Sequence, residues 1–138
     1  MSVLMLAFYG EGRSDREFLP PLIQRTSDAI LAHYAQSVVE IWDIRIIEKK
    51  RGDLGTCILQ ASKEVGECHA LLVHSDADRL GYWEAREDRF TPGQTLVHNY
   101  SGWSCQNLLP VIPVREKEAW MLADFEALSA VPSASLEQ

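Results

Sequence analysis

The sequence lacks the features of a membrane-spanning or disulfide-bonded protein. No apolar run approaches the roughly 20 residues that a membrane-spanning helix needs, so we expect no membrane association. The three cysteines, Cys57, Cys68 and Cys105, are an odd number without C-x-x-C spacing, which argues against a disulfide framework and a zinc knuckle. The apolar run near the N-terminus has no basic segment before it, so it predicts a strand and not a signal peptide. We therefore expect a cytoplasmic protein with reduced thiols.

Positive charge is also scarce. The chain has 13 Lys and Arg against 20 Asp and Glu, which gives a formal net charge of −7. Proteins that bind nucleic acid over a broad face carry a basic surface, so this balance argues against that mode of binding. The one basic cluster, Lys49-Lys50-Arg51, precedes Gly52 in a predicted strand-to-helix loop, where a solvated loop is the simpler interpretation. A phosphate substrate would need help from another group.

Neither of two common phosphate-binding loops is present. The G-E-G turn at 10–12 follows an apolar run, but the third glycine of G-x-G-x-x-G falls on Asp15. Glu11 would also repel a pyrophosphate at the start of a helix. The G-K-[ST] sequence of a P-loop is missing as well. Another explanation is needed for a carboxylate at the end of an apolar run.

The chain does contain an alternation of strand-like and helix-like segments. Its 138 residues, 46% hydrophobic and 24% charged, have the size and composition of one globular domain, so we take 1–138 as a single domain. Apolar and β-branched runs predict strands. The predicted strands are 3–9, 38–47, 70–74 and 108–114, the last restricted to a sheet edge or an irregular ladder by two prolines.

Helical spacing predicts three helices between and after these strands. The first begins with a capping box of Ser14 and Glu17, and we expect a kink at its two adjacent prolines. The predicted helices are 14–34, 53–67 and 116–130, with only a short helix at 83–89 within the irregular segment 80–107. This order predicts an α/β fold with a mainly parallel sheet of about four strands and helices on both faces.

Acidic residues follow two of the predicted strands. Glu11 follows the first strand, and Asp76 and Asp78 follow the third. Sites in open α/β sheets form beyond the carboxyl ends of the strands, so these carboxylates converge on one crevice if the two strands are neighbours. Like charges repel unless something neutralises them, and hard oxygen ligands suit Mg²⁺ or Mn²⁺. The sequence therefore predicts a divalent-metal site.

Simpler explanations exist for each residue taken alone. Aspartates are common in turns after strands, and Glu11 alone would be a solvated loop residue, so only the joint pattern favours a metal. His74 lies on the same strand face as Asp76, but a strand-end histidine with its hydrogen bonds satisfied is the better interpretation. Ser14 and Asp15 are explained as helix-capping residues without any substrate.

The motif E-G-x-S-D at 11–15, followed after a β-α unit by the D-x-D at 76–78, resembles the TOPRIM domain of topoisomerases, bacterial primases and OLD-family nucleases. The segment P-V-R-E-K-E-A-W at 113–120 is similar to a bacterial TOPRIM-like family of unknown function, which carries R-E-x-E-x-W after its last strand. The resemblance covers roughly residues 3–124. It implies that Glu11 acts as general acid or base or as a metal ligand. It also implies that Asp76 and Asp78 hold one or two Mg²⁺ ions for phosphodiester chemistry.

The C-terminal segment supplies candidates that complete such a site. Glu116 and Glu118 point to opposite sides of a regular helix, so only one of them is expected to join the metal. We favour Glu118, because it shares a face with apolar residues where an unpaired carboxylate would be costly. Arg115 is then its partner or a phosphate contact. Arg79 is either a second phosphate contact or an ion-pair partner of Asp78 or Glu84.

These expectations lead to two functions of different classes. The first is a Mg²⁺- or Mn²⁺-dependent phosphodiesterase, a nuclease or nuclease subunit that meets nucleic acid through its metal site, for which bacterial phage defence is a common setting. The second is a non-catalytic module that keeps the fold and binds another protein, as the negative charge suggests. A D-x-D phosphatase ranks last, because 76–80 lacks the form D-x-D-x-[TV]. The extended nucleases add DNA-binding domains and continue past the position of Asp124, so part of the site could lie outside this chain.

Overall fold

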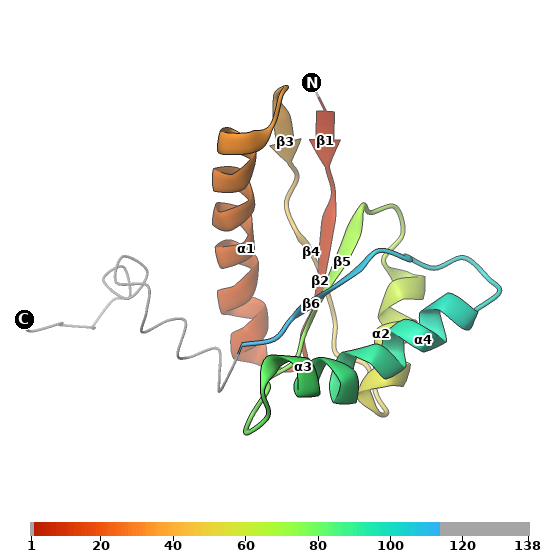
Figure 1. Cartoon of the computed structure of the whole chain (residues 1–138). Helices are drawn as coiled ribbons and strands as arrows, with labels where there is room; N and C mark the ends of the chain where they lie inside the picture. Colours follow the sequence, from red (N-terminus) through yellow and green to blue (C-terminus); the bar gives the residue numbers. More distant parts are fainter. Residues whose placement is uncertain (1, 114–138) are drawn as a thin grey trace, which may run out of the picture.

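The computed structural model describes residues 2–113, which are coloured in Figure 1. The predicted helix 116–130 lies outside these residues. Six strands are present in the described part, and all of their pairings are parallel. They are β1 (Ser2–Leu4), β2 (Leu6–Tyr9), β3 (Val39–Ile41), β4 (Arg45–Ile47), β5 (Ala70–His74) and β6 (Leu108–Val111). A four-stranded sheet has the order β4-β2-β5-β6, and β1 pairs with β3. The expected α/β fold with a parallel sheet of four strands is confirmed.

Strand β2 is central and entirely buried, as its continuous apolar sequence predicts. The predicted strand 3–9 is broken at Met5, whose N–H donates to Nδ1 of His69 at 2.9 Å. The predicted strand 38–47 is likewise divided into β3 and β4. Strand β1 leads directly into β2, and β3 leads into β4. The β1–β3 ladder therefore lies beyond the amino ends of β2 and β4, as Figure 1 shows.

Helix α1 (Arg13–Tyr34) begins one residue before the predicted start and contains both Pro20 and Pro21. The predicted capping box of Ser14 and Glu17 is wrong. Gly12 is the N-cap, and its N–H donates to Oδ2 of Asp15 at 3.0 Å. Glu17 instead pairs with Arg13 at 3.1 Å on the exposed surface of the first turn.

Helix α2 (Leu54–Glu64) starts where a local signal fixes it. Asp53 is the N-cap, and its carboxylate accepts hydrogen bonds from the N–H and the hydroxyl of Thr56 at 2.9 and 3.0 Å. The hydrogen bond from the Thr56 N–H is the main reason that the pKa of Asp53 lies below its ordinary value. This helix follows the loop that carries the basic cluster.

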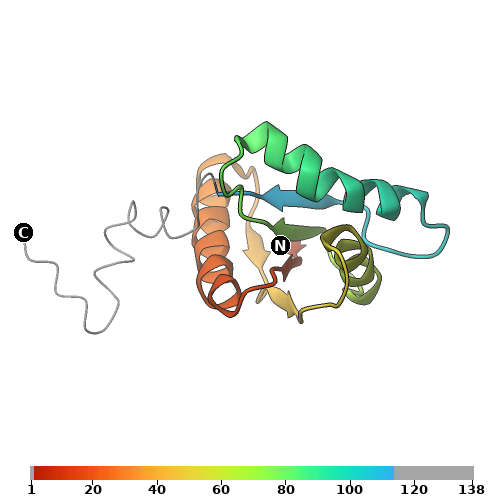
Figure 2. The ribbon, with the colours of Figure 1, turned by 90° about the horizontal axis from the view of Figure 1, so that it is seen from below.

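The segment 80–107 is more helical than its sequence suggests. It holds α3 (Tyr82–Ala85), a π-helical turn (Arg86–Phe90) and α4 (Thr91–Asn99), so the predicted short helix underestimates it. Pro92 and Gly93 suggested a break, yet both lie in α4. A Cβ on Gly93 would lie 2.5 Å from Cδ1 and 2.8 Å from Cβ of Ile58, so glycine permits α4 to approach α2 closely. Figure 2 shows these two helices side by side.

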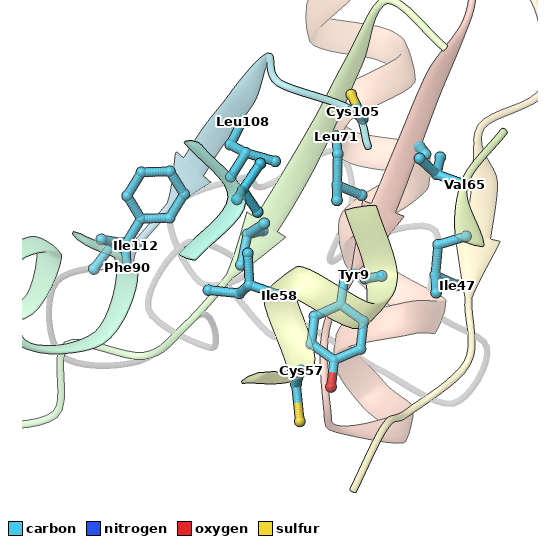
Figure 3. Close-up of a cluster of buried hydrophobic side chains, with 14 of the residues drawn as sticks. Tyr9, Ile47, Cys57, Ile58, Val65, Leu71, Phe90, Cys105, Leu108 and Ile112 are labelled. Carbon is cyan, nitrogen blue, oxygen red and sulfur yellow. The ribbon is translucent and has the colours of Figure 1, made fainter. Parts of the chain in front are cut away.

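The hydrophobic core joins the central strands to α2, α4 and the edge strand β6. Figure 3 shows its side chains, which include Tyr9, Ile58, Leu71, Phe90 and Leu108. Strand β6 contains Pro110 and occupies the sheet edge, as predicted. In the described part of the chain, no helix has both the length and the apolar character required to cross a membrane.

Candidate functional site

The pairing of β2 with β5 brings the predicted acidic residues to one edge of the sheet. Tyr9 lies opposite Val73 at the ends of these neighbouring parallel strands. Glu11 then follows β2, and Asp76 and Asp78 follow β5. All three carboxylates line one pocket of about 310 Å³. The complete lining is Glu11, Gly12, Asp15, Leu54, His74, Ser75, Asp76, Asp78 and Arg89.

A buried histidine connects two aspartates at the base of this pocket. Nε2 of His74 lies 3.1 Å from Oδ1 of Asp76, and Nδ1 lies 3.3 Å from Oδ2 of Asp15. His74 and Asp15 are buried, whereas Asp76 is partly exposed. The histidine therefore fixes the direction in which Asp76 presents its carboxylate. The interpretation of His74 as a strand-end histidine with satisfied hydrogen bonds agrees with these contacts.

Asp15 has a larger part in the site than helix capping alone. Its Oδ2 accepts from the Gly12 N–H and contacts the His74 ring, so the first turn of α1 and the end of β5 share one carboxylate. A Cβ at Gly12 would lie 2.5 Å from that same oxygen. The glycine and the aspartate of E-G-x-S-D thus depend on each other, and this local structure holds Glu11 at the pocket.

Arg89 is the basic residue of the pocket. Its Nη1 lies 2.8 Å from Oδ2 of Asp78 and also donates to the backbone carbonyl of Asp76. Sequence reasoning placed Arg89 in the short helix 83–89 but did not assign it to the site, because no local pattern shows that this helix lies beside the end of β5. Arg79, the predicted phosphate contact, is exposed and is not among the lining residues. The ion pair considered between Arg79 and Asp78 is replaced by Arg89.

The backbone of Asp78 is in the left-handed region, with φ of +53°. Aspartate and asparagine adopt this conformation more readily than most residues other than glycine. The turn after β5 is further held by the N–H of Ala77, which donates to the carbonyl of Pro113 at 3.2 Å. The carboxylate of Asp78 is thereby directed towards the pocket where Arg89 meets it.

The pocket lining contains the kind of donor atom that a hard divalent cation takes. Three carboxylates line one pocket, and Mg²⁺ takes oxygen ligands of this kind. His74 uses one oxygen of Asp76 and Arg89 uses one oxygen of Asp78, so each aspartate keeps a second oxygen for another ligand. Within residues 2–113, no three His, Cys, Asp or Glu side chains are arranged as a preformed metal-binding group. Glu118 and Arg115, predicted to complete the site, lie outside the described residues.

No protein-family model matches the chain, and neither a curated protein nor a solved structure matches it. The site is therefore interpreted from its own residues.

Proposed function

We propose that the protein is a TOPRIM-like, Mg²⁺- or Mn²⁺-dependent phosphodiesterase, acting as a nuclease or as a nuclease subunit. One observation carries the proposal: Glu11, Asp76 and Asp78 follow two neighbouring parallel strands and line the same pocket. Carboxylates that share a pocket with one arginine need further positive charge, which a divalent cation supplies. The cytoplasm and phage defence are the proposed setting.

The fold part of this proposal is a TOPRIM-like domain with helices on both faces of its sheet. The view in Figure 2, with α1 and α2 on different sides of the strands, supports it. The burial pattern along β2 also supports helices on both faces. Ala7 and Tyr9 belong to the core cluster that includes residues of α2, whereas Phe8, between them and also buried, points to the opposite face of the sheet.

Five of the pocket residues have a role in the proposed reaction. Asp76 and Asp78 would hold the cation, and the contacts of His74 with Asp15 and Asp76 keep one of these aspartates in place. When bound, the cation supplies Lewis-acid stabilisation of the phosphate oxygens. Glu11, exposed at the pocket, takes a proton from the attacking water as its oxygen bonds to phosphorus. The bond to the leaving oxygen breaks, and that oxygen takes a proton from solvent.

The test compares cleavage by wild-type protein and Asp76→Ala. Labelled single-stranded and double-stranded DNA and RNA are incubated with Mg²⁺ or Mn²⁺, and the products are followed over time. We expect cleavage by the wild type that stops on addition of a chelator and falls at least about 100-fold in Asp76→Ala. Glu17→Ala, an exposed change in the same acidic protein, serves as control and keeps wild-type activity. Equal cleavage by wild type and Asp76→Ala would remove the metal mechanism.

A non-catalytic, protein-binding module is the second candidate, and a specific surface favours it. Ile30, Tyr34, Val38 and Trp42 expose much of their apolar side chains around the end of α1 and the β1–β3 ladder. Ile30 and Tyr34 line one hollow of α1, and exposed apolar groups that share a surface in this way are typical of protein-binding sites. A protein that binds no Mg²⁺ or Mn²⁺ and cleaves none of the four nucleic acids supports this second function over the first.

A further inference from the structure

Arg89 occupies the position of a cation in the acidic pocket. One guanidinium nitrogen, Nη1, contacts the carboxylate of Asp78 at 2.8 Å and the backbone carbonyl of Asp76. These are the two residues of the D-x-D turn, and both contacts are made to oxygen atoms. A positive group bound to oxygen atoms of this turn does what a metal ion would do there, namely reduce the repulsion between neighbouring carboxylates.

The surroundings of Arg89 allow its side chain to move. It comes from a π-helical turn, a rare element that occurs frequently at functional sites. A second carboxylate oxygen, Oδ2 of Asp88, lies 3.6 Å from its Nε and is well exposed. The guanidinium therefore keeps a partner on its own helical turn if it leaves Asp78. Arginine also suits the next step, because its planar set of donors matches a phosphate group.

We propose that Arg89 is a built-in counter-ion of Asp78 that a divalent cation displaces and that then binds the substrate phosphate. This proposal rests on the proposed function, because it takes Asp76 and Asp78 as the metal ligands. In the described part of the chain, an arginine already holds one of these carboxylates. Substrate binding is thereby linked to metal binding.

If a cation displaces Arg89, then removing this arginine changes metal binding in the opposite direction from removing a purely structural arginine. A cation that binds Asp78 must compete with the guanidinium, so removing the guanidinium strengthens metal binding. If Arg89 only positioned the aspartates, its removal would weaken metal binding instead. The sign of the change therefore distinguishes the two roles.

The first experiment is a calorimetric titration of the full chain with Mn²⁺. Arg89→Gln is expected to bind Mn²⁺ roughly three- to tenfold more tightly than the wild type, as expected for loss of a competing, partly exposed ion pair. Arg89→Lys keeps a cation at this position and should bind like the wild type. Arg86→Gln removes the same charge from the same helical turn, away from the pocket lining, and is the matched control.

Several results would overturn the proposal. Equal or weaker Mn²⁺ binding by Arg89→Gln excludes displacement, and an equal gain in Arg86→Gln reduces the effect to net charge. Thermal unfolding of each variant shows whether it remains folded, and a misfolded Arg89→Gln is replaced by Arg89→Met in the same titration. If neither wild type nor any variant binds Mn²⁺, the proposed metal-dependent function itself fails, which is a different result from binding that Arg89 does not affect.

The second experiment tests the phosphate contact. A short fluorescent oligodeoxynucleotide is titrated with wild type, Arg89→Gln and Arg86→Gln at saturating Ca²⁺, which takes oxygen ligands as Mg²⁺ does. Arg89→Gln should bind the oligonucleotide about tenfold more weakly although it binds metal more tightly, and Arg86→Gln should match the wild type. Equal binding by wild type and Arg89→Gln would overturn the phosphate contact.

Discussion

The two ends of the sheet differ sharply in how deeply their side chains are buried. At the carboxyl ends of β2 and β5, Phe8 and Tyr9 are fully buried, and even the polar His74 and Asp15 are nearly inaccessible. At the other end, the β1–β3 ladder and the last turns of α1 expose apolar side chains. Ile30 is 52% exposed, Tyr34 78%, Val38 70% and Trp42 53%.

This difference indicates that side chains pack less tightly at the β1–β3 ladder than in the four-stranded sheet that leads to the acidic pocket. The pocket end has a hydrophobic core and a set of hydrogen-bonded polar groups that fix one another, which is what a precise site requires. The far end depends more on backbone hydrogen bonds, such as those from Ser2 to Val38 and from Trp42 to Leu4, both 3.1 Å. The comparison predicts unequal responses to matched substitutions at the two ends.

Phe8→Ala should have the largest effect on stability. It removes a fully buried aromatic side chain from the central strand, which costs about 3–5 kcal/mol of unfolding free energy. Trp42→Ala removes a larger but half-exposed ring at the far end and should cost less than about 1 kcal/mol. Urea unfolding followed by circular dichroism measures both. Comparable losses would contradict the unequal distribution of packing.

His74→Leu should have the next largest effect. The change removes the ring that contacts Asp15 and Asp76, and losing such buried polar contacts costs about 1–3 kcal/mol. His33→Leu, an exposed histidine near the end of α1, should change the unfolding free energy by less than about 0.5 kcal/mol. The same urea titration compares them. A neutral His74→Leu would show that the histidine does not support the pocket.

Alkaline pH should lower the stability of the protein through Cys68, a half-buried residue just before β5. Cys68 lies 3.3 Å from Cys105, sulfur to sulfur, and burial raises its pKa from 9.0 to about 12. The folded state therefore keeps a proton that the unfolded state loses above about pH 9. Stability is fully present below pH 9 and falls as the pH rises towards 12. Burial raises the pKa of Tyr9 as well, which adds to this fall.

Cys68→Ala tests this assignment. The variant should lose less stability than the wild type between about pH 9 and pH 12, as followed by urea unfolding in a series of buffers. Parallel curves for the two proteins would show that Cys68 does not contribute to the alkaline loss.

The smallest expected effect comes from the surface of the pocket end itself. Arg13 and Glu17 form an exposed pair one helical turn apart, so Arg13→Ala should change the unfolding free energy by no more than about 0.5 kcal/mol. A loss of several kcal/mol would mean that stability at this end depends on surface charge instead of packing.

Sequence reasoning predicted the parts of the fold that carry local signals. Apolar runs identified β2 and β5, prolines identified β6 as an edge, and acidic residues after two strands identified the pocket. The interruption at Met5 was not visible, because it depends on a hydrogen bond to His69, far away in the sequence. Local patterns do not contain such long-range contacts.

The same limit explains the missed site residues. Arg89 belongs to the predicted short helix 83–89, but no local pattern shows that this helix lies beside the end of β5. Pro92 and Gly93 concealed only the following helix α4, in which Gly93 is tolerated because α4 packs closely on α2. Asp15 was interpreted as a capping residue, which it is, but its contact with His74 requires β5 to lie beside the start of α1. The G-E-G turn is a local sign of this close approach, since a Cβ at Gly10 or at Gly12 would crowd Asp15.

The central claim is that the carboxylates at the pocket end hold a divalent cation. Isothermal titration with Mg²⁺ and Mn²⁺ tests it most directly, with Asp76→Asn as the pocket variant and Asp43→Asn, an exposed residue near the β1–β3 ladder, as the control. We expect saturable binding by the wild type and by Asp43→Asn, and affinity at least about tenfold lower for Asp76→Asn. No saturable binding by the wild type, or equal affinity for wild type and Asp76→Asn, would contradict the account.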